Sequence, residues 1–274
     1  MGVDLAASRG WRTLAASVVG TAHASAGLPC ADACAARVLR PRKGGPLLVA
    51  VAADGAGTSE RAPEGARLAC EAVLQRARRW ATRRADLSTF GREAFLPWMD
   101  HARAHIARAA RAERRETRDF SCTLLVALVG EGRAVFFQIG DGAIVYRGAG
   151  RAYVPALWPQ TGEYANCTWF VTDEDAAGRV QSTAAENVHE VALLTDGLQG
   201  LALRFSTREA HGPFFEPMFA RLRREREGQP KGLLEELRAF LGSAPVNQRT
   251  DDDKTLVLAT RARPAAAASV KAEA

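Results

Sequence analysis

Apolar stretches of two kinds follow one another along the chain, and they predict strands on both sides of a pair of helices. The continuous apolar run over 47–53 is typical of a strand buried on both faces. From about 59 to 81 the period becomes helical, and a second helix is expected from about 89 to 117. The apolar stripe of the first helix consists of Ala66, Cys70, Val73, Ala77 and Trp80. Two consecutive helices of this length are expected to pack as an antiparallel pair on a sheet.

The remaining pattern predicts more strands, two later helices and one long loop. Helices are expected at about 206–225 and 230–242, and residues 156–187, with prolines and glycines, form an irregular loop. Strands are expected at 11–20, 32–39, 121–129, 133–139, 144–147, 152–154, 188–195 and 254–260. This order indicates one layered α+β domain over 8–261, followed by an Ala-rich disordered tail over 262–274.

Composition restricts the environment of the chain. No 18 apolar residues run together, so we expect no membrane span, and the N-terminus has no apolar segment typical of a signal peptide. The five cysteines are scattered, which favours reduced thiols in a cytoplasm over a disulfide framework. The net charge of +6 is mostly arginine, on solvated helix faces or on a surface for an acidic partner. Few aromatic residues interleave with the arginines, which makes nucleic-acid binding unlikely as a function.

Carboxylates stand at the ends of several predicted strands. Asp54, Asp141 and Asp196 each follow an apolar run and precede a glycine, and a further cluster at 251–253 precedes the last strand. A carboxylate at a buried strand end is unfavourable without a positive partner, and several together repel one another. The partner expected for such a group is a divalent cation with oxygen ligands, Mg²⁺ or Mn²⁺. Asp-Gly is also a common turn pair, so the alternative of ordinary turn residues stays open.

Seven short motifs occur in a specific order, and together they resemble one family. They are Gly20-Thr21-Ala22-His23, Pro29-Cys30-Ala31-Asp32-Ala33, Val51-Ala52-Ala53-Asp54-Gly55, Ser121-Cys122-Thr123, Ile139-Gly140-Asp141-Gly142, Leu194-Thr195-Asp196-Gly197-Leu198 and Asp252-Asp253-Lys254-Thr255. From about Trp11 to Thr260 the chain resembles metal-dependent serine/threonine protein phosphatases of the type 2C class, compact bacterial branch. The resemblance implies a two-sheet antiparallel β-sandwich flanked by helices, in α-β-β-α layers.

The resemblance also implies a two-metal site with Asp54, Asp196 and Asp252 as its catalytic ligands. Asp54 would bridge the metals, the Gly55 carbonyl would bind one of them, and Asp196 and Asp252 would hold the other. Asp32 would support the second metal partly through water, and Asp141 would bind a third, weaker ion. In the implied mechanism a metal-bridging hydroxide attacks phosphorus in line, and no covalent phosphoenzyme forms.

Two positions depart from the family pattern near the expected phosphate site. Gly27 stands five residues before Asp32, where many members carry a phosphate-binding arginine, and Ala56 replaces a histidine that some relatives have. His23 is our candidate for a substrate-binding residue in their place. The partners implied are phosphorylated proteins, with a serine/threonine kinase whose action the enzyme opposes.

Two other functions are compatible with the same residues. The first is a phosphatase-like domain that binds phosphorylated partners with little or no hydrolysis, which the missing arginine favours. The second is a different two-metal phosphoesterase such as a nuclease, because two-metal sites serve both reactions.

Overall fold

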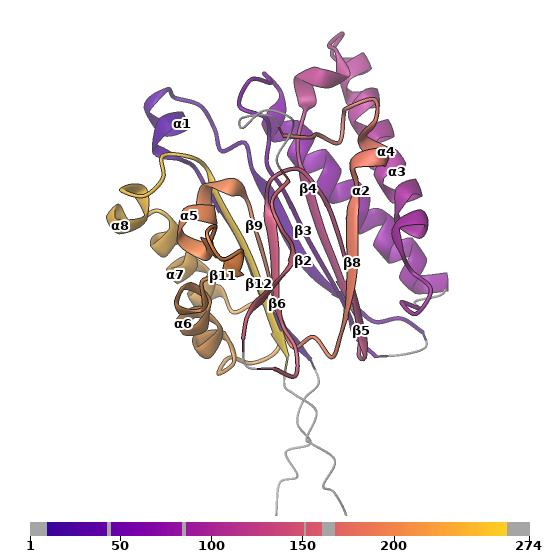
Figure 1. Cartoon of the computed structure of the whole chain (residues 1–274). Coiled ribbons are helices and arrows are strands. Elements are labelled where there is room, and N and C mark those ends of the chain that lie inside the picture. Colours follow the sequence, from indigo (N-terminus) through magenta and orange to yellow (C-terminus); the bar gives the residue numbers. More distant parts are fainter. Residues whose placement is uncertain (1–9, 43–44, 84–85, 151, 161–167, 262–274) are drawn as a thin grey trace, which may run out of the picture.

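A computed structural model describes residues 10–42, 45–83, 86–150, 152–160 and 168–261. Two five-stranded antiparallel sheets face one another, and helices cover the outer face of each (Figure 1). The α+β sandwich with α-β-β-α layers is therefore confirmed. The expected tail over 262–274 lies outside the described residues.

The first sheet has the strand order β2-β3-β4-β5-β8 and carries the two long helices. Its strands are β2 (Ala33–Leu39), β3 (Leu47–Ala53), β4 (Leu124–Val129), β5 (Arg133–Ile139) and β8 (Gln181–Glu186). On its outer face lie α2 (Ala62–Arg83) and α3 (Arg92–Ala112), which pack on each other and on the sheet through buried apolar side chains. The expected helix pair on a sheet is confirmed.

The second sheet has the order β1-β12-β9-β6-β7 and carries the C-terminal helices. Its strands are β1 (Trp11–Val18), β12 (Lys254–Arg261), β9 (Glu190–Leu194), β6 (Ala143–Arg147) and β7 (Val154–Leu157). Helices α6 (Gly212–Leu222) and α7 (Lys231–Leu241) bury phenylalanines and leucines against its outer face. The shorter elements are α1 (Thr21–Ser25), a 3₁₀ turn (Thr117–Phe120), α4 (Ala176–Arg179), a second 3₁₀ turn (Asp196–Leu198), α5 (Gln199–Ala202), β10 (Leu203–Arg204), β11 (Glu209–Ala210) and α8 (Ala244–Asn247).

The inner faces of the two sheets form a separate apolar layer. Strand β3 is buried along its whole length because one side meets the helices and the other meets the second sheet. This explains its uninterrupted apolar sequence. The side chains between the sheets include Trp11, Leu48, Phe136, Val191 and Val257.

The prediction that residues 156–187 form an irregular loop is wrong in part. Residues 156 and 157 end β7, and Gln181–Glu186 form β8, which pairs with β5 at the edge of the first sheet. The β8 side chains are exposed or half-buried, so this strand has no apolar pattern in the sequence. None of the helices in the described part of the chain is both long and apolar enough to cross a membrane.

Candidate metal centre and active site

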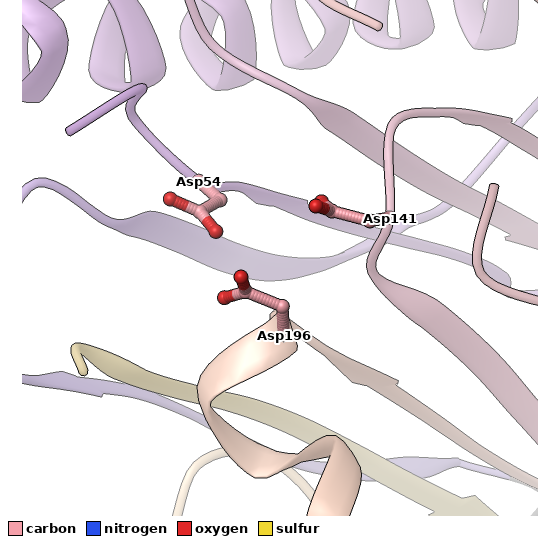
Figure 2. A group of neighbouring side chains, drawn as sticks. All are labelled: Asp54, Asp141 and Asp196. Carbon is pink, nitrogen blue, oxygen red and sulfur yellow. The ribbon is translucent and has the colours of Figure 1, made fainter. Parts of the chain in front are cut away.

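Three aspartates from different parts of the chain meet at one end of the sandwich. Asp54 follows β3, Asp141 lies where the chain passes from β5 to β6, and Asp196 follows β9. One carboxylate oxygen of each lies within 4.8 Å of the others. Figure 2 shows the three side chains pointing toward one another from separate segments. Because β3 and β9 belong to different sheets, both sheets supply the group.

Burial and mutual repulsion change how these carboxyl groups titrate. Burial, with the negative charges of Asp32 and Asp196, raises the pKa of Asp54 well above its ordinary value. Burial raises the pKa of Asp141 to about 6, and Asp196 adds to this. The pKa of Asp32 rises to about 7, mainly through burial, although the neighbouring side chains of Thr255 and Thr195 oppose the rise. A nearby cation would relieve this repulsion and restore the charged forms.

Buried carboxylate oxygens without hydrogen-bond partners also indicate a bound cation. Oδ1 of Asp32, Oδ1 of Asp141 and Oδ1 of Asp196 are buried, and within the described ranges none has a hydrogen-bond partner. A buried polar atom without a partner is costly, so native structures usually satisfy it with protein, water or an ion. Buried carboxylate oxygens are ligands that hard divalent cations prefer. The residues present therefore fit a divalent metal centre.

Asp32 and Asp252 are not members of the group within 4.8 Å, but they adjoin it. Asp32 precedes β2, and its Oδ2 accepts a hydrogen bond from Thr195 Oγ1 at 2.8 Å, one residue before Asp196. Asp252 precedes β12, and burial, followed by the charge of Asp196, raises its pKa. The five aspartates that the sequence singled out thus interact electrostatically, although their roles as ligands stay predictions.

The glycines of the Asp-Gly pairs allow close approach of neighbouring backbone. A Cβ at Gly55 would lie 2.7 Å from the Ala31 carbonyl oxygen, and one at Gly197 would lie 2.0 Å from the Asp253 carbonyl oxygen. Neither glycine has a positive φ. The steric requirement at these two positions therefore comes from packing of loops around the carboxylates, rather than from the left-handed backbone of an ordinary turn.

Asp253 is a supporting residue that the sequence analysis did not assign. It is almost fully buried and accepts hydrogen bonds from the backbone N–H groups of Gly20 at 2.6 Å and Ala31 at 2.5 Å. Its Oδ2 also lies 2.9 Å from Nδ1 of His23. Asp253 thus joins the loop that carries His23 to the loop that carries Asp32. In the sequence, Asp253 stood out only as a member of the acidic cluster at 251–253.

Two further polar side chains hold the backbone of the ligand loops. Thr123 Oγ1 accepts a hydrogen bond from the Asp54 N–H at 2.9 Å, and Gln199 Nε2 donates to the Asp141 carbonyl at 2.5 Å. Thr123 belongs to the Ser121-Cys122-Thr123 motif of the sequence. Gln199 lies three residues after Asp196 and gave no signal.

A cavity of about 280 Å³ adjoins the segment that follows Asp54 and Gly55. Its walls are mostly apolar, and His23, Thr58, Ser59 and Glu60 add polar groups. Ala56 and Leu28 also line it. Leu28 directly follows Gly27, the other position that departs from the family pattern. The cavity therefore includes one of the two positions that depart from the family pattern, and it adjoins the other in the sequence.

Part of the segment 156–187, which the sequence predicted to be an irregular loop, lies beside Asp141. The Gly140 N–H donates to Gln160 Oε1 at 2.6 Å, and the nearby Thr168 side chain lowers the pKa of Asp141 against the larger, opposing effect of burial. Residues 161–167 are outside the described ranges. Part of this segment therefore lies beside the candidate site.

A sequence model of the family described as protein phosphatase 2C matches residues 19–242. The chain therefore belongs to this family and is a metal-dependent serine/threonine protein phosphatase, as the motifs predicted. It is 40% identical over 252 residues to serine/threonine-protein phosphatase 3 of Escherichia coli (strain K12), covering 91% of this chain and 98% of the relative.

Solved structures share the fold. A crystal structure of a bacterial serine phosphatase matches with a TM-score of 0.63 and 13% identity, over 92% of this chain and 98% of the other. The catalytic domain of the serine/threonine protein phosphatase PstP in complex with two manganese ions matches with a TM-score of 0.57 and 16% identity, over the same shares. At these identities the likeness concerns the sandwich alone.

Proposed function

We propose that the chain hydrolyses phosphoserine and phosphothreonine in proteins at the Asp54–Asp141–Asp196 group, and so opposes a serine/threonine kinase. The observation that carries this proposal is the convergence of three carboxylates within 4.8 Å, with buried oxygens left unpartnered. Two divalent cations, Mg²⁺ or Mn²⁺, would supply an activated water and neutralise charge on the phosphoryl group. The manganese ions of the PstP structure support the choice of this class of metal.

The proposed roles of the aspartates follow from their positions. Asp54, which alone among them follows the fully buried strand β3, would bridge the ions, with the Gly55 carbonyl as an added ligand. Asp196 and Asp252 would hold the second ion, supported by Asp32. The unpartnered oxygen of Asp141 supports a direct ligand role for this residue beside its expected part in a third ion.

The cavity beside Gly55 is the proposed place of the substrate residue. His23 lines it, and its Nδ1 is held by Asp253, so Nε2 is the ring atom left to contact a phosphate. With Gly27 and Ala56 in place of larger polar residues, phosphate binding would depend mainly on the metals and on His23. The thiols support a cytoplasmic location, because the four described cysteines form no disulfide with one another.

The test is hydrolysis of a phosphothreonine peptide with Mn²⁺, with EDTA, and by Asp54→Asn protein with Mn²⁺. We expect activity only in the first sample, with a loss of at least about 100-fold in kcat for the variant, because a bridging charge is removed. Asp100→Asn, at an exposed position on α3, is the matched control and keeps full activity. Full activity of Asp54→Asn, with its fold intact, would show that the site is elsewhere.

A further inference from the structure

A group of basic side chains lies on the helix pair α2–α3, away from the aspartates. It consists of Arg76 and Arg79 on α2 and of His101, His105 and Arg108 on α3, and is called here the α2–α3 basic cluster. The two histidine rings are in contact, with centroids 4.4 Å apart. Figure 1 shows these helices side by side on the outer side of the first sheet.

The members of the cluster interact electrostatically. Desolvation lowers the pKa of His101, and His105, Arg76, Arg79 and Arg108 each lower it further. The pKa of His105 is also lowered, first by desolvation and then by Arg108. Positive groups from two helices are therefore close enough to repel one another, which opposes binding of a metal cation by the histidine pair.

The cluster has little compensating negative charge. Over the described ranges, no ion pair within 4.0 Å is recorded for Arg76, Arg79 or Arg108. Glu71 raises the pKa of His105, but its Oε1 is held at 2.8 Å by Arg67. In addition, Nε of Arg76 and Nε2 of His101 are buried and have no hydrogen-bond partner in the described part of the molecule. In the described part of the chain, the two helices thus carry arginine side chains without an ion-pair partner, above buried nitrogen atoms that have no hydrogen bond.

We propose that the α2–α3 basic cluster binds an acidic segment of the phosphoprotein substrate. Guanidinium groups bind carboxylates through paired, charge-assisted hydrogen bonds, and the side chains of Arg79 and Arg108 are exposed to a ligand. The cluster lacks exposed aromatic rings among its members, so it does not have the stacking platform of a single-strand nucleic-acid site. This inference rests on the proposed function, since it assigns a second contact to the same substrate.

The distance between the α2–α3 basic cluster and the active site determines how many residues must separate the acidic segment from the phosphorylated residue. Ala62, the first residue of α2, packs beside Gly55, where its Cβ would lie 2.8 Å from a Cβ added at the glycine. Arg76 lies about four turns further along the helix, which corresponds to about 21 Å. An extended peptide covers this distance in about six to seven residues. The acidic segment would therefore lie at least that far from the phosphorylated residue.

The experiment compares two phosphothreonine peptides that differ only in a distal segment, four glutamates in one and four glutamines in the other, eight residues from the phosphothreonine. With Mn²⁺ at low salt, we expect kcat/KM for the acidic peptide to be about fivefold higher or more, through KM. Arg76→Gln/Arg108→Gln protein loses this preference and keeps its activity on the glutamine peptide. Arg224→Gln/Arg226→Gln, with the same charge loss at exposed positions after α6, is the control that keeps it.

Binding of the unphosphorylated acidic peptide, measured by fluorescence anisotropy in EDTA, tests the cluster without catalysis. Weaker binding by Arg76→Gln/Arg108→Gln, with control protein unchanged, supports the docking site even if neither phosphopeptide is hydrolysed, in which case the proposed function alone fails. An unchanged preference in Arg76→Gln/Arg108→Gln protein would overturn the inference. So would loss of binding to a single-stranded oligonucleotide without any change in peptide binding.

Discussion

Asp252 and Asp253 are neighbours in the sequence but have different surroundings. Asp253 is buried and accepts hydrogen bonds from two loops, whereas Asp252 is partly exposed to the site and adjoins Asp196. The sequence identified both residues only as an acidic cluster, because motif and composition do not show which carboxylate faces inward. The family resemblance selected Asp252 as a ligand, and the hydrogen bonds of Asp253 are consistent with that choice.

Asp141 gives a prediction about stability without metal. Its pKa is raised from an ordinary value of 3.8 to about 6, so the folded protein binds this proton more tightly than the unfolded chain does. Stability from this group is therefore present at low pH and lost as the pH rises through about 6. In EDTA, Asp141→Asn should stabilise the protein by about 1 to 3 kcal/mol at pH 7.5 and by less at pH 4.5. Urea unfolding at the two pH values measures both differences.

A second Asp→Asn variant controls for the effect of the amide group itself on stability. Asp100→Asn, exposed on α3, should change the free energy of unfolding little at either pH. An equal stabilisation by Asp141→Asn at both pH values would mean that packing, rather than charge, causes the effect.

At the scale of elements, apolar periodicity located most strands and both long helices. It missed β8 because an edge strand with exposed side chains has no alternation to detect, and its existence depends on hydrogen bonds to β5. Helix α6 begins at Gly212, later than the expected 206, because residues 203–210 form a small hairpin. The aspartates were predicted from their place at strand ends. The cavity beside them was not, since it forms where separate loops meet.

The start of β12 gives a second prediction. The Lys254 side chain is fully buried, and its Nζ donates to Asn247 Oδ1 at 3.0 Å, to the Asp252 carbonyl at 3.2 Å and to the Val19 carbonyl at 3.4 Å. Lys254→Met removes all three bonds and should cost about 2 to 4 kcal/mol of stability. It should also weaken Mn²⁺ activation, because the backbone of Asp252 loses its tie to the end of β1.

Chemical unfolding and activity titrated against Mn²⁺ measure these two effects. Lys231→Met, at an exposed position that begins α7, is the matched control and should be close to unmutated protein in both. A Lys254→Met protein with reduced stability but an unchanged Mn²⁺ requirement would separate the buried lysine from the metal site.

For the whole molecule, the candidate metal centre draws its residues from both sheets. Asp54 comes from the first sheet and Asp196 from the second, so bound ions would hold them together in the folded state only. Mn²⁺ at about 100 times its dissociation constant should add about 2.7 kcal/mol to the stability of EDTA-treated protein. For a chain of this size that corresponds to about 5 to 10 °C in Tm. Scanning calorimetry measures the shift.

The rise in Tm on addition of Mn²⁺ should be small or absent in Asp54→Asn protein, which loses the bridging charge. Hydrogen exchange should slow in strands of both sheets when Mn²⁺ is added to unmutated protein. Slower exchange in one sheet alone would contradict a centre shared between them.

The pairing of β12 also has a consequence for synthesis on the ribosome. The first sheet can form once residue 186 has emerged, but β12 is the strand between β1 and β9 in the second sheet and comes from residues 254–261. Until then β1, made first, has no neighbouring strand to pair with among the described strands, and the loop of Asp252 and Asp253 is missing from the site. The nascent chain can therefore carry a formed first sheet only late in its translation, and phosphatase activity should begin only after the last strand leaves the exit tunnel.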